Sequence, residues 1–327
     1  MKKEERIYIK RFSKIDNLDQ YMAQILFDKH GERFIKYREN WSKSMDMDYE
    51  SGFPMHLDLE TVDACNLSCE ICIRAYDKGS KKKFDFELYK SIINEGSMYG
   101  LSSVMFGNGG EPTLHPELPE MIEYAAAKGV MDTIIVTNGQ VLNSEKTIDL
   151  VMAGVTRISF SLDAATEEIY KLVRKSDLDK VENCINAVLD YKKKRNIKLP
   201  IIRVSFCNFE KNRSEKEMFI EKWMNKVDYI DIQDYIPPPQ SGIEELKDID
   251  VEPFSCPQPW QRLSVNPDGT VYPCCTYYAK FMLLGNLKEH SLKYLWDSGK
   301  IKELRNSLKN GNYSIICKNC FGRREKQ

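Results

Sequence analysis

Residues 55–72 read MHLDLETVDACNLSCEIC, an alternating pattern that runs directly into three closely spaced cysteines. From 55 to 60 polar and apolar residues alternate, which predicts a β-strand whose successive side chains point to opposite faces. One face carries Met55, Leu57 and Leu59, and the other carries His56, Asp58 and Glu60. If helices cover the apolar face, the polar face lines the interior of the sheet. Glu60 is then a candidate catalytic residue, although such a polar row can equally serve only to hold the fold.

Strand-like runs recur along the chain and alternate with helix-like segments. The runs are 55–63, 102–106, 133–137, 157–162, 201–207 and 229–235. The clearest helical segments are 86–98, 117–128, 181–194 and 214–225. This alternation predicts an α/β fold in which right-handed βαβ units form a parallel sheet. Six units suit an incomplete barrel or a doubly wound sheet, and periodicity does not separate the two. In either fold, functional residues lie at the C-terminal ends of the strands.

The bulk composition narrows the functional classes. Of the 327 residues, 42% are hydrophobic and 30% are charged, as is typical of a soluble globular protein. The net charge of −1 disfavours nucleic acid as a partner, because nucleic-acid surfaces usually need a basic excess. No apolar run approaches the ~18 residues of a membrane span, and residues 1–6 lack the apolar stretch of a secretory signal. We therefore expect a cytoplasmic protein with no membrane partner.

Cysteine usage points to metal chemistry. Ten cysteines are many for a reducing compartment, where thiols rarely pair as structural disulfides. A front group holds Cys65, Cys69 and Cys72, and a rear group holds Cys256, Cys274, Cys275, Cys317 and Cys320. Cys184 and Cys207 stand alone, and Cys184 shares the apolar face of a predicted helix, so we expect it in the core.

The front cysteines have the spacing C-x3-C-x2-C directly after the first strand. Three thiolates on one loop can hold three irons of a cubane cluster and leave the fourth iron open to a reactive ligand. A structural zinc site would instead need four ligands, usually in CxxC pairs. Zinc or an incidental group of thiols therefore stays the minor alternative.

This spacing, at this place in a βα fold, resembles the radical S-adenosylmethionine (SAM) superfamily. The resemblance implies a partial (β/α)6 barrel, which we assign to residues 51–236, after an N-terminal helical cap at 1–50. It also implies a 4Fe–4S cluster whose open iron is chelated by SAM. Reductive cleavage of SAM then yields methionine and a 5′-deoxyadenosyl radical. A flavodoxin- or ferredoxin-type protein is the expected reductant.

Further segments match the motifs of this superfamily in the expected order. Gly109-Gly110-Glu111-Pro112 resembles its GGEP segment, in which glycines let the backbone approach the ligand and a carboxylate accepts from the methionine ammonium. Asn138-Gly139 is also a common turn, and Arg174 could instead pair with a helix carboxylate. The residues that the resemblance assigns to SAM are Ile71, Gly109, Gly110, Glu111, Asn138, Ser161, Arg174 and Ser205.

Four rear cysteines, Cys256, Cys274, Cys317 and Cys320, have the spacing C-x17-C-x42-C-x2-C. On spacing alone they suit either a structural zinc or a fully ligated cluster. Their surroundings, including a hairpin signal at 266–269 and short helices at 291–298 and 300–308, resemble the SPASM/twitch modules of the superfamily. We therefore predict a small cysteine-rich SPASM/twitch module at 237–327 with one auxiliary 4Fe–4S cluster. Cys275 could replace Cys274 as a ligand.

The resemblance extends to members that act on small polar substrates, in particular 2-deoxy-scyllo-inosamine dehydrogenase-like enzymes. It favours oxidation of a carbinol on a sugar or aminocyclitol, with Arg203 or Gln233 as a candidate substrate contact. Epimerisation is the alternative, with Cys207 at the end of the fifth strand as hydrogen donor. A peptide-modifying maturase and a non-catalytic zinc protein are two further alternatives.

Overall fold

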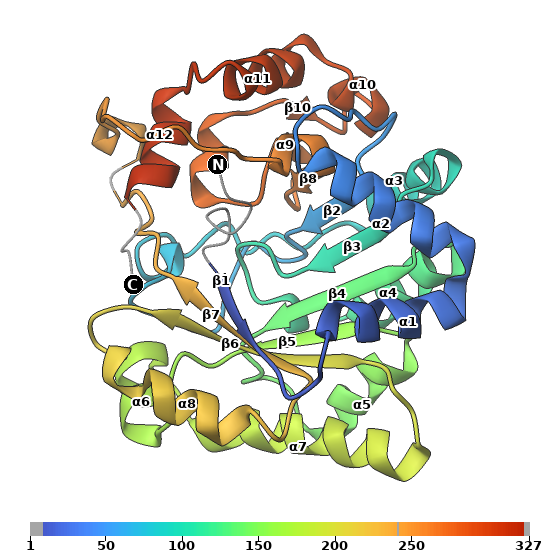
Figure 1. The fold of residues 1–327 in the computed structure, drawn as a ribbon, viewed down its shortest axis with the longest axis vertical. Helices are drawn as coiled ribbons and strands as arrows, with labels where there is room; N and C mark the ends of the chain where they lie inside the picture. Colours follow the sequence, from blue (N-terminus) through green and yellow to red (C-terminus); the bar gives the residue numbers. More distant parts are fainter. Residues whose placement is uncertain (1–8, 241, 324–327) are drawn as a thin grey trace.

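The computed structural model describes residues 9–240 and 242–323. The remaining positions, which fall in the predicted cap and in the predicted C-terminal module, lie outside the described residues. Throughout the described chain the strands form one sheet with the order β1-β7-β6-β5-β4-β3-β2-β8-β9-β10 (Figure 1). The strands are β1 (Ile9–Phe12), β2 (His56–Leu59), β3 (Ser103–Phe106), β4 (Asp132–Thr137), β5 (Arg157–Ser161), β6 (Ile201–Asn208), β7 (Tyr229–Asp234), β8 (Arg262–Val265), β9 (Thr270–Tyr272) and β10 (Gly285–Asn286).

Strands β2 to β7 are parallel, and each lies beside the next in chain order. A doubly wound sheet reverses its strand order at a switch point, and this sheet does not. The barrel is also open, because the outer neighbours of β2 and β7 are β8 and β1 and not each other. The predicted partial (β/α)6 barrel is thereby confirmed, and all six predicted strands are present.

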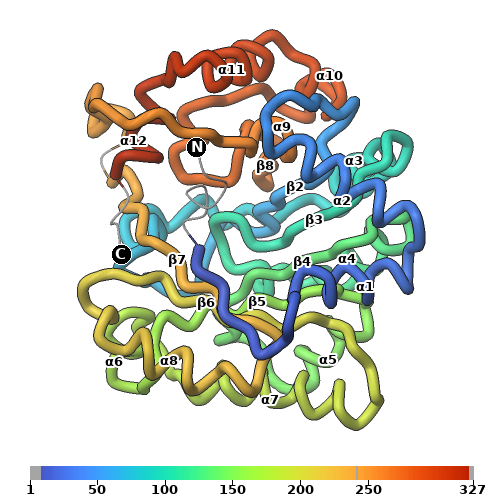
Figure 2. The backbone as a smooth tube through the Cα atoms, in the orientation of Figure 1, coloured from blue at the N-terminus to red at the C-terminus, as the bar shows by residue number. Residues whose placement is uncertain are grey.

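Helices cover the outer face of the barrel strands (Figure 2). The helices are α1 (Leu18–His30), α2 (Glu32–Ser44), α3 (Phe86–Tyr99), α4 (Leu118–Ala127), α5 (Ser144–Met152), α6 (Glu167–Arg174), α7 (Leu178–Arg195), α8 (Lys216–Trp223), α9 (Gln258–Gln261), α10 (Leu292–Trp296), α11 (Gly299–Lys309) and α12 (Ile315–Gly322). Short 3-10 helices lie at η2 (Ile73–Ala75), η3 (Pro112–Leu114), η4 (Arg213–Glu215), η5 (Ile243–Glu245) and η6 (Tyr277–Phe281). Between helices and sheet, Leu57 and Leu59 are fully buried in the main core, which includes Cys184 as predicted.

The N-terminal segment contributes a strand as well as helices. Helices α1 and α2 match the helical stretches expected before the barrel. Strand β1 pairs antiparallel with β7, with Ile9 opposite Gln233, and this pairing was not predicted. One edge of the open barrel is therefore covered by the start of the chain.

The C-terminal module continues the same sheet. The predicted hairpin is confirmed, since β8 and β9 pair antiparallel around residues 266–269. The two predicted short helices correspond to α10 and α11. Strand β8 also pairs parallel with β2, with His56 opposite Arg262. The cysteine-rich module is therefore joined to the barrel through backbone hydrogen bonds, and its loops meet the C-terminal ends of the barrel strands.

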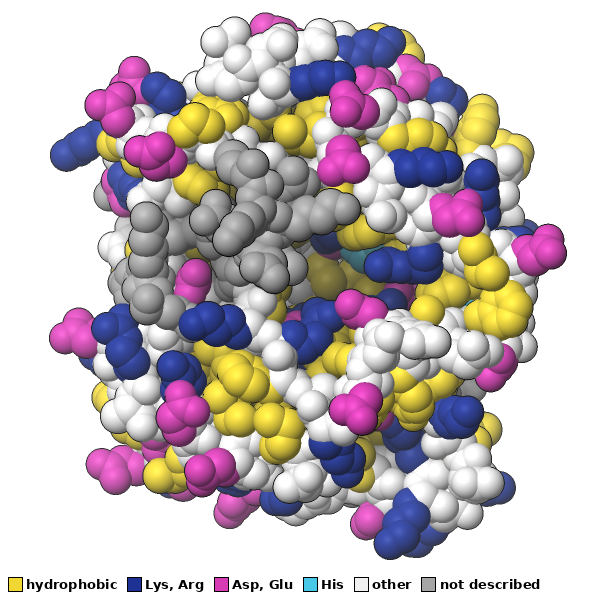
Figure 3. Space-filling model, in the orientation of Figure 1, with side chains coloured by type: hydrophobic (Ala, Val, Ile, Leu, Met, Phe, Trp, Pro, Cys, Tyr) yellow, Lys and Arg dark blue, Asp and Glu magenta, His cyan; other side chains and the backbone are white. Residues whose placement is uncertain are grey.

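Within residues 9–240 and 242–323, none of the helices has both the length and the apolar character that crossing a membrane requires. Basic and acidic side chains are mixed over the face drawn in Figure 3, in keeping with the net charge of −1.

Candidate active site

A polar cavity of about 420 Å³ lies at the C-terminal ends of the barrel strands. Strands β5, β6 and β7 supply one wall, and the segment that follows β9 supplies another. Many residues that the sequence assigned to SAM or to catalysis line it together: Cys69, Ile71, Cys72, Gly109, Ser161, Arg174, Ser205 and Cys207. The cavity therefore gathers residues that are up to about 140 positions apart in the sequence, as expected when strand ends converge.

The loop that carries the front cysteines is held by backbone contacts with the segment that contains Gly110 and Glu111. The amide of Glu111 donates to the carbonyl of Ala64 at 2.9 Å. A Cβ on Gly110 would lie 1.9 Å from the carbonyl oxygen of Val62 and 2.6 Å from that of Ala64. Gly110 is therefore needed for the close packing of two backbone segments. It was predicted to lie beside SAM, and the structure places it against the loop that carries the front cysteines.

Each front thiol faces a side-chain donor from a different part of the chain. Asn138 Nδ2, after β4, lies 3.5 Å from Cys65 Sγ. Arg174 Nη1, in α6, lies 3.7 Å from Cys69 Sγ. The hydroxyl of Tyr277, in η6, lies 3.2 Å from Cys72 Sγ. Hydrogen bonds to sulfur stabilise thiolates and tune iron–sulfur clusters, so this set of donors fits a loop that holds iron.

Arg174 is placed for an anionic ligand. Its Nη2 lies 2.5 Å from a carboxylate oxygen of Asp163, so its partner is a residue after β5 and not a helix carboxylate. Its Nε is buried and has no hydrogen-bond partner among the described residues. Asp163 also accepts from the backbone amide of Cys207 at 2.7 Å. A carboxylate such as that of SAM would satisfy the remaining donor.

Glu111 lies behind the cavity wall. One carboxylate oxygen accepts from the Thr137 hydroxyl at 2.6 Å, and the other accepts from the amide of Asn138 at 2.7 Å. Thr113 donates to it as well, from both its amide and its hydroxyl. Burial raises the pKa of Glu111, and these donors act against that rise. In this structure the carboxylate fixes the end of β4, and with it Asn138, rather than facing the cavity.

Glu60 is part of a buried ionic network. It pairs with Arg74, which also contacts Asp63 at 2.6 Å and donates to the carbonyl of Gly109 at 3.1 Å. Burial raises the pKa of Glu60 to about 7, against the opposing effects of Lys280 and Arg74. This geometry favours the structural alternative, in which the polar row holds the loops, over a catalytic role for Glu60.

Arg203 is also bound to a carboxylate. Its Nε lies 3.4 Å from Asp231, and Arg11 of β1 lies 2.8 Å from the same buried carboxylate. Along β6, Ser205 and Cys207 line the cavity, whereas Arg203 lies nearer the start of the strand. A direct substrate contact for Arg203 therefore remains a prediction.

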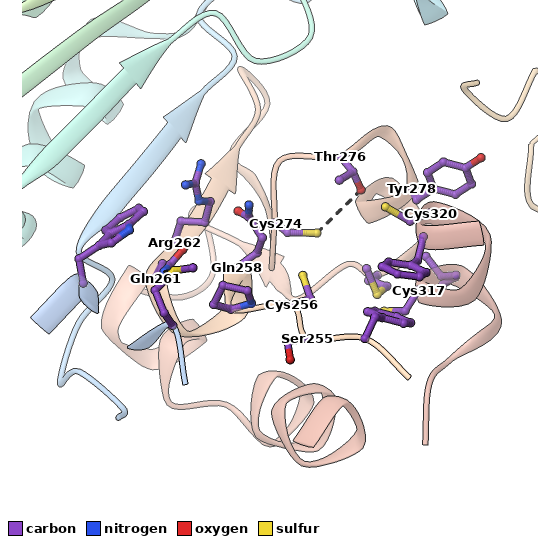
Figure 4. Close-up of a pocket in the computed structure, with 17 residues that line it drawn as sticks. Ser255, Cys256, Gln258, Gln261, Arg262, Cys274, Thr276, Tyr278, Cys317 and Cys320 are labelled. Atoms are coloured by element: carbon purple, nitrogen blue, oxygen red, sulfur yellow. Dashed lines mark hydrogen bonds between the residues drawn. The ribbon is translucent and has the colours of Figure 1, made fainter. Parts of the chain in front are cut away.

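A second cavity, of about 310 Å³, brings together the four rear thiols Cys256, Cys274, Cys317 and Cys320. Figure 4 shows Cys317 and Cys320 on one helix, α12, with Cys256 and Cys274 on separate segments beside it. Burial raises the pKa of Cys256 and that of Cys320 to about 12. Because burial disfavours the thiolate, these thiols keep their protons until a metal ion binds and displaces the protons. The rear site therefore suits metal ligation.

Cys275 lines the polar cavity and not the second cavity. Its sulfur lies 4.0 Å from Arg262 Nη1, which in turn contacts Asp58 at 3.3 Å. Two adjacent residues after β9 thus line different cavities, Cys274 the rear one and Cys275 the polar one. This placement favours Cys274 over Cys275 as the ligand.

In the described part of the chain, no group of three or more His, Cys, Asp or Glu side chains is arranged around a single metal ion. Cysteines that bind different irons of a cubane cluster need not converge on one point, because each ligates its own iron. The front thiols with their donors and the rear thiols with their cavity are each compatible with such a cluster.

Comparison with protein-family models gives two matches. Residues 59–204 match the model of the radical SAM superfamily, and residues 256–321 match that of the SPASM iron-sulfur cluster-binding domain. The chain contains a radical SAM domain followed by a SPASM domain. A radical SAM domain implies SAM and a 4Fe–4S cluster, and a SPASM domain implies an auxiliary iron–sulfur cluster.

Individual relatives are distant. A tungsten-containing aldehyde ferredoxin oxidoreductase cofactor-modifying protein from Pyrococcus furiosus is 32% identical over 109 residues, 33% of this chain and 30% of that protein. Among solved structures, BtrN in complex with AdoMet and 2-DOIA has a TM-score of 0.58 at 19% identity, covering 83% of this chain and 94% of BtrN. Streptococcus suis SuiB bound to the precursor peptide SuiA has a TM-score of 0.56 at 14% identity, covering 83% of this chain and 71% of SuiB.

The chain spans between 30% and 54% of the length of the first curated relatives it matches. The solved structures share the radical SAM fold, and their substrates differ in kind. The reaction of this chain is therefore not given by likeness alone.

Several residues of this radical SAM site were not identified from the sequence. Tyr277 and Thr276 line the polar cavity because β8 and β9 extend the barrel sheet, a pairing that the sequence did not reveal. Asp163, which follows β5, contacts Arg174 and accepts from the Cys207 amide, and no role was predicted for it. The sequence pattern that could have identified Asp163 is a carboxylate after a strand, followed by a helix that contains an arginine.

Replacing Tyr277 with phenylalanine is expected to lower the reduction potential of the front cluster. Burial raises the pKa of the Tyr277 hydroxyl well above its usual value, so it keeps its proton and can donate to a Cys72 thiolate. Loss of one hydrogen bond to sulfur should shift the one-electron equilibrium by about tenfold, or 59 mV. An EPR-monitored redox titration measures this shift, and an unchanged potential would show that the hydroxyl does not reach the cluster.

Proposed function

We propose that this radical SAM enzyme oxidises a carbinol on a polar sugar- or cyclitol-like substrate bound in the 420 Å³ cavity. The observation that carries the proposal is the divergence of Cys274 and Cys275. The first lines the cavity of the rear thiols, and the second lines the cavity in which the substrate would sit. An electron acceptor at the rear site would therefore be bound by Cys274, whose neighbour in sequence, Cys275, lines the substrate cavity.

When bound, the front cluster and SAM supply a 5′-deoxyadenosyl radical that abstracts hydrogen from unactivated carbon, and the rear cluster supplies a one-electron acceptor. The proposed oxidation would break the carbinol C–H bond, and the deoxyadenosyl carbon would accept its hydrogen atom. The hydroxyl proton would be lost, and one electron would go to a cluster held by Cys256, Cys274, Cys317 and Cys320. A carbonyl remains on the substrate.

The side chains of the protein bind and orient the clusters and SAM. We assign Cys65, Cys69 and Cys72 to the front cluster and Cys256, Cys274, Cys317 and Cys320 to the rear cluster. Arg174, with its buried Nε donor, suits the SAM carboxylate, and Gly109, Ser161 and Ser205 line the same region. Ile71 offers apolar surface for the adenine. Glu111 and Asn138 act by holding the cysteine loop.

The side chains along the rest of the cavity wall support the proposed substrate class. Asn108, Gln233, Asp234 and Tyr235 line the cavity with amide, carboxylate and hydroxyl groups. Such groups both donate and accept, as the recognition of several hydroxyl and amino groups on one ring requires. BtrN, whose fold this chain shares, was solved with 2-DOIA, whereas SuiB was solved with a peptide. Because SAM would fill part of this cavity, the space left beside it suits a small polar ring better than a long peptide.

The test is an anaerobic assay with 2-deoxy-scyllo-inosamine, a panel of amino sugars and a linear peptide as probes. Oxidation predicts a product two hydrogens lighter, formed in step with deoxyadenosine. A modified peptide with unchanged sugars would overturn the substrate class. Deoxyadenosine formed without any substrate-dependent increase on the sugar panel would also count against it.

Epimerisation is the second candidate, because Cys207 lines the same cavity. A thiol there could return a hydrogen atom to the opposite face of the substrate carbon. Under the proposed oxidation, Cys207→Ser should keep product formation within about threefold of wild type, as should the control Cys184→Ser in the core. Product of unchanged mass that carries solvent deuterium, and that is lost only in Cys207→Ser, would establish epimerisation instead.

A further inference from the structure

Residues 78–83 read KGSKKK and place four lysines in one short surface segment. All four, Lys78, Lys81, Lys82 and Lys83, are exposed. In a chain of net charge −1, this run is a local positive excess. This segment lies beside the loop that carries the front cysteines.

The lysine segment is built onto the loop that carries the front cysteines. The Asp63 amide donates to the Lys82 carbonyl at 2.8 Å, and the Lys81 amide donates to the Asp63 carbonyl at 2.9 Å. An antiparallel bridge joins Val62 to Lys83. Asp63 lies two residues before Cys65, so the lysines are attached to the backbone that enters the cluster loop.

Side-chain contacts fix the segment further. The Asp63 carboxylate accepts from both the amide and the hydroxyl of Ser80, each at 2.7 Å. Gly79 has a φ of 73°, and a Cβ there would lie 2.2 Å from the Asp63 carbonyl oxygen. The Asp63 carboxylate is paired with Arg74 and hydrogen-bonded to Ser80 rather than to the lysine side chains. The backbone is thus held in place while the lysine side chains stay exposed, with Lys78 Nζ also donating to the Arg74 carbonyl at 3.0 Å.

We propose that the lysine segment 78–83 is the docking surface for a small acidic one-electron carrier protein that reduces the front cluster. The cysteine loop comes to the surface beside it, since Asn66 is exposed, Cys65 is partly exposed and Tyr76 is 50% exposed. A carrier on the lysines would therefore lie next to the cluster. The step transfers one electron from the carrier to the cluster and moves no atoms.

Electrostatics supplies the recognition. A cluster of like charges steers a partner of opposite charge and raises its association rate by 10- to 10³-fold at low ionic strength. The effect is screened by salt over a Debye length of about 10 Å at 0.1 M. The proposal rests on the front cluster assigned under the proposed function, and it adds the surface through which that cluster receives its electron.

The test compares two variants of the reconstituted enzyme. The first is Lys78→Gln/Lys81→Gln/Lys82→Gln/Lys83→Gln. The matched control replaces four exposed basic residues at or just after the C-terminal end of α7 with glutamine: Lys193, Lys194, Arg195 and Lys198. That end of α7 precedes β6, and so lies at the opposite edge of the sheet from the cysteine loop. Stopped-flow absorbance follows reduction of the cluster by flavodoxin hydroquinone and, separately, by reduced methyl viologen, a small cation.

At low salt, flavodoxin should reduce the lysine variant at least about tenfold more slowly than wild type or control. Its rate should also lose the salt dependence of wild type, and all three proteins should react alike with methyl viologen. Equal flavodoxin rates, or an equal loss in the control, would overturn the proposal. So would oligonucleotide binding that is lost in the lysine variant while the flavodoxin rate is kept. Failure of methyl viologen to reduce wild type would instead overturn the front cluster itself.

Discussion

Replacing Cys65, Cys69 and Cys72 together with alanine is expected to abolish formation of deoxyadenosine from SAM. Without these thiolates no iron at the front loop can present an open site to the cofactor. The rear thiols lie in a separate cavity and should keep their cluster, so the iron content should fall by about half rather than to zero. Chromatographic detection of deoxyadenosine and colorimetric iron analysis measure both effects.

Cys184→Ala serves as the control, because this thiol lies in the core near the carbonyl of Gly139 and away from both cavities. It should keep wild-type iron and SAM cleavage, apart from a modest loss of stability. Deoxyadenosine from the triple variant at the wild-type rate would show that the front loop does not bind the reactive cluster.

Gly110→Ala is expected to reduce SAM cleavage by about 10²-fold, the cost of a misplacement near 1 Å in a reacting site. The added Cβ would lie 1.9 Å from the Val62 carbonyl oxygen and 2.6 Å from that of Ala64, both of them backbone atoms. The cysteine loop must then move, and the hydrogen bond from Glu111 to Ala64 is disturbed. Deoxyadenosine assays at saturating SAM, with iron content on the same samples, measure the loss.

Gly52→Ala is the matched control, because a Cβ at Gly52 would meet no atom within 4 Å among the described residues. It should leave activity within about twofold of wild type. Wild-type activity in Gly110→Ala would mean that the two backbone segments are not packed as described.

The βα alternation could be predicted from the sequence because each strand of β2 to β7 carries its own apolar signal and the clearest helices alternate with these strands. The choice of a barrel over a doubly wound sheet came from the resemblance to the radical SAM superfamily. Helices α5 and α6 were not predicted, since α6 has only eight residues and lies between polar turns. Strand β1 was missed because its four residues, IKRF, carry little pattern and depend on β7 for pairing.

The site was predictable where residues adjoin in sequence and less so where the fold brings them together. The C-x3-C-x2-C loop, the GGEP segment and Arg174 all have local signatures, and most of the assigned residues line one cavity. Tyr277 reaches Cys72 across 205 positions through the parallel pairing of β8 with β2. No local pattern encodes such a contact, because pairing between distant strands is decided by the packing of the whole sheet.

Roles of charged residues were the least predictable. Glu60 and Arg203 have the residue types of catalytic groups, and the structure pairs each with an oppositely charged residue, Arg74 and Asp231 respectively. A buried carboxylate or guanidinium without such a partner is costly, so a pairing of this kind is the ordinary use of these residues. Sequence shows the type of a side chain but not which partner compensates its charge.

The central claim is that two separate sets of cysteines hold two clusters, of which only the front one meets SAM. The most direct measurement is EPR spectroscopy of the reduced, anaerobically reconstituted protein with and without SAM, alongside its iron and sulfide content. We expect about eight irons and eight sulfides per chain, and a reduced-cluster signal that changes on addition of SAM. The SAM-dependent change should be absent from the Cys65/Cys69/Cys72→Ala protein, which keeps the rear signal. Zinc in place of iron, or a spectrum that SAM leaves unchanged in wild type, would contradict the account.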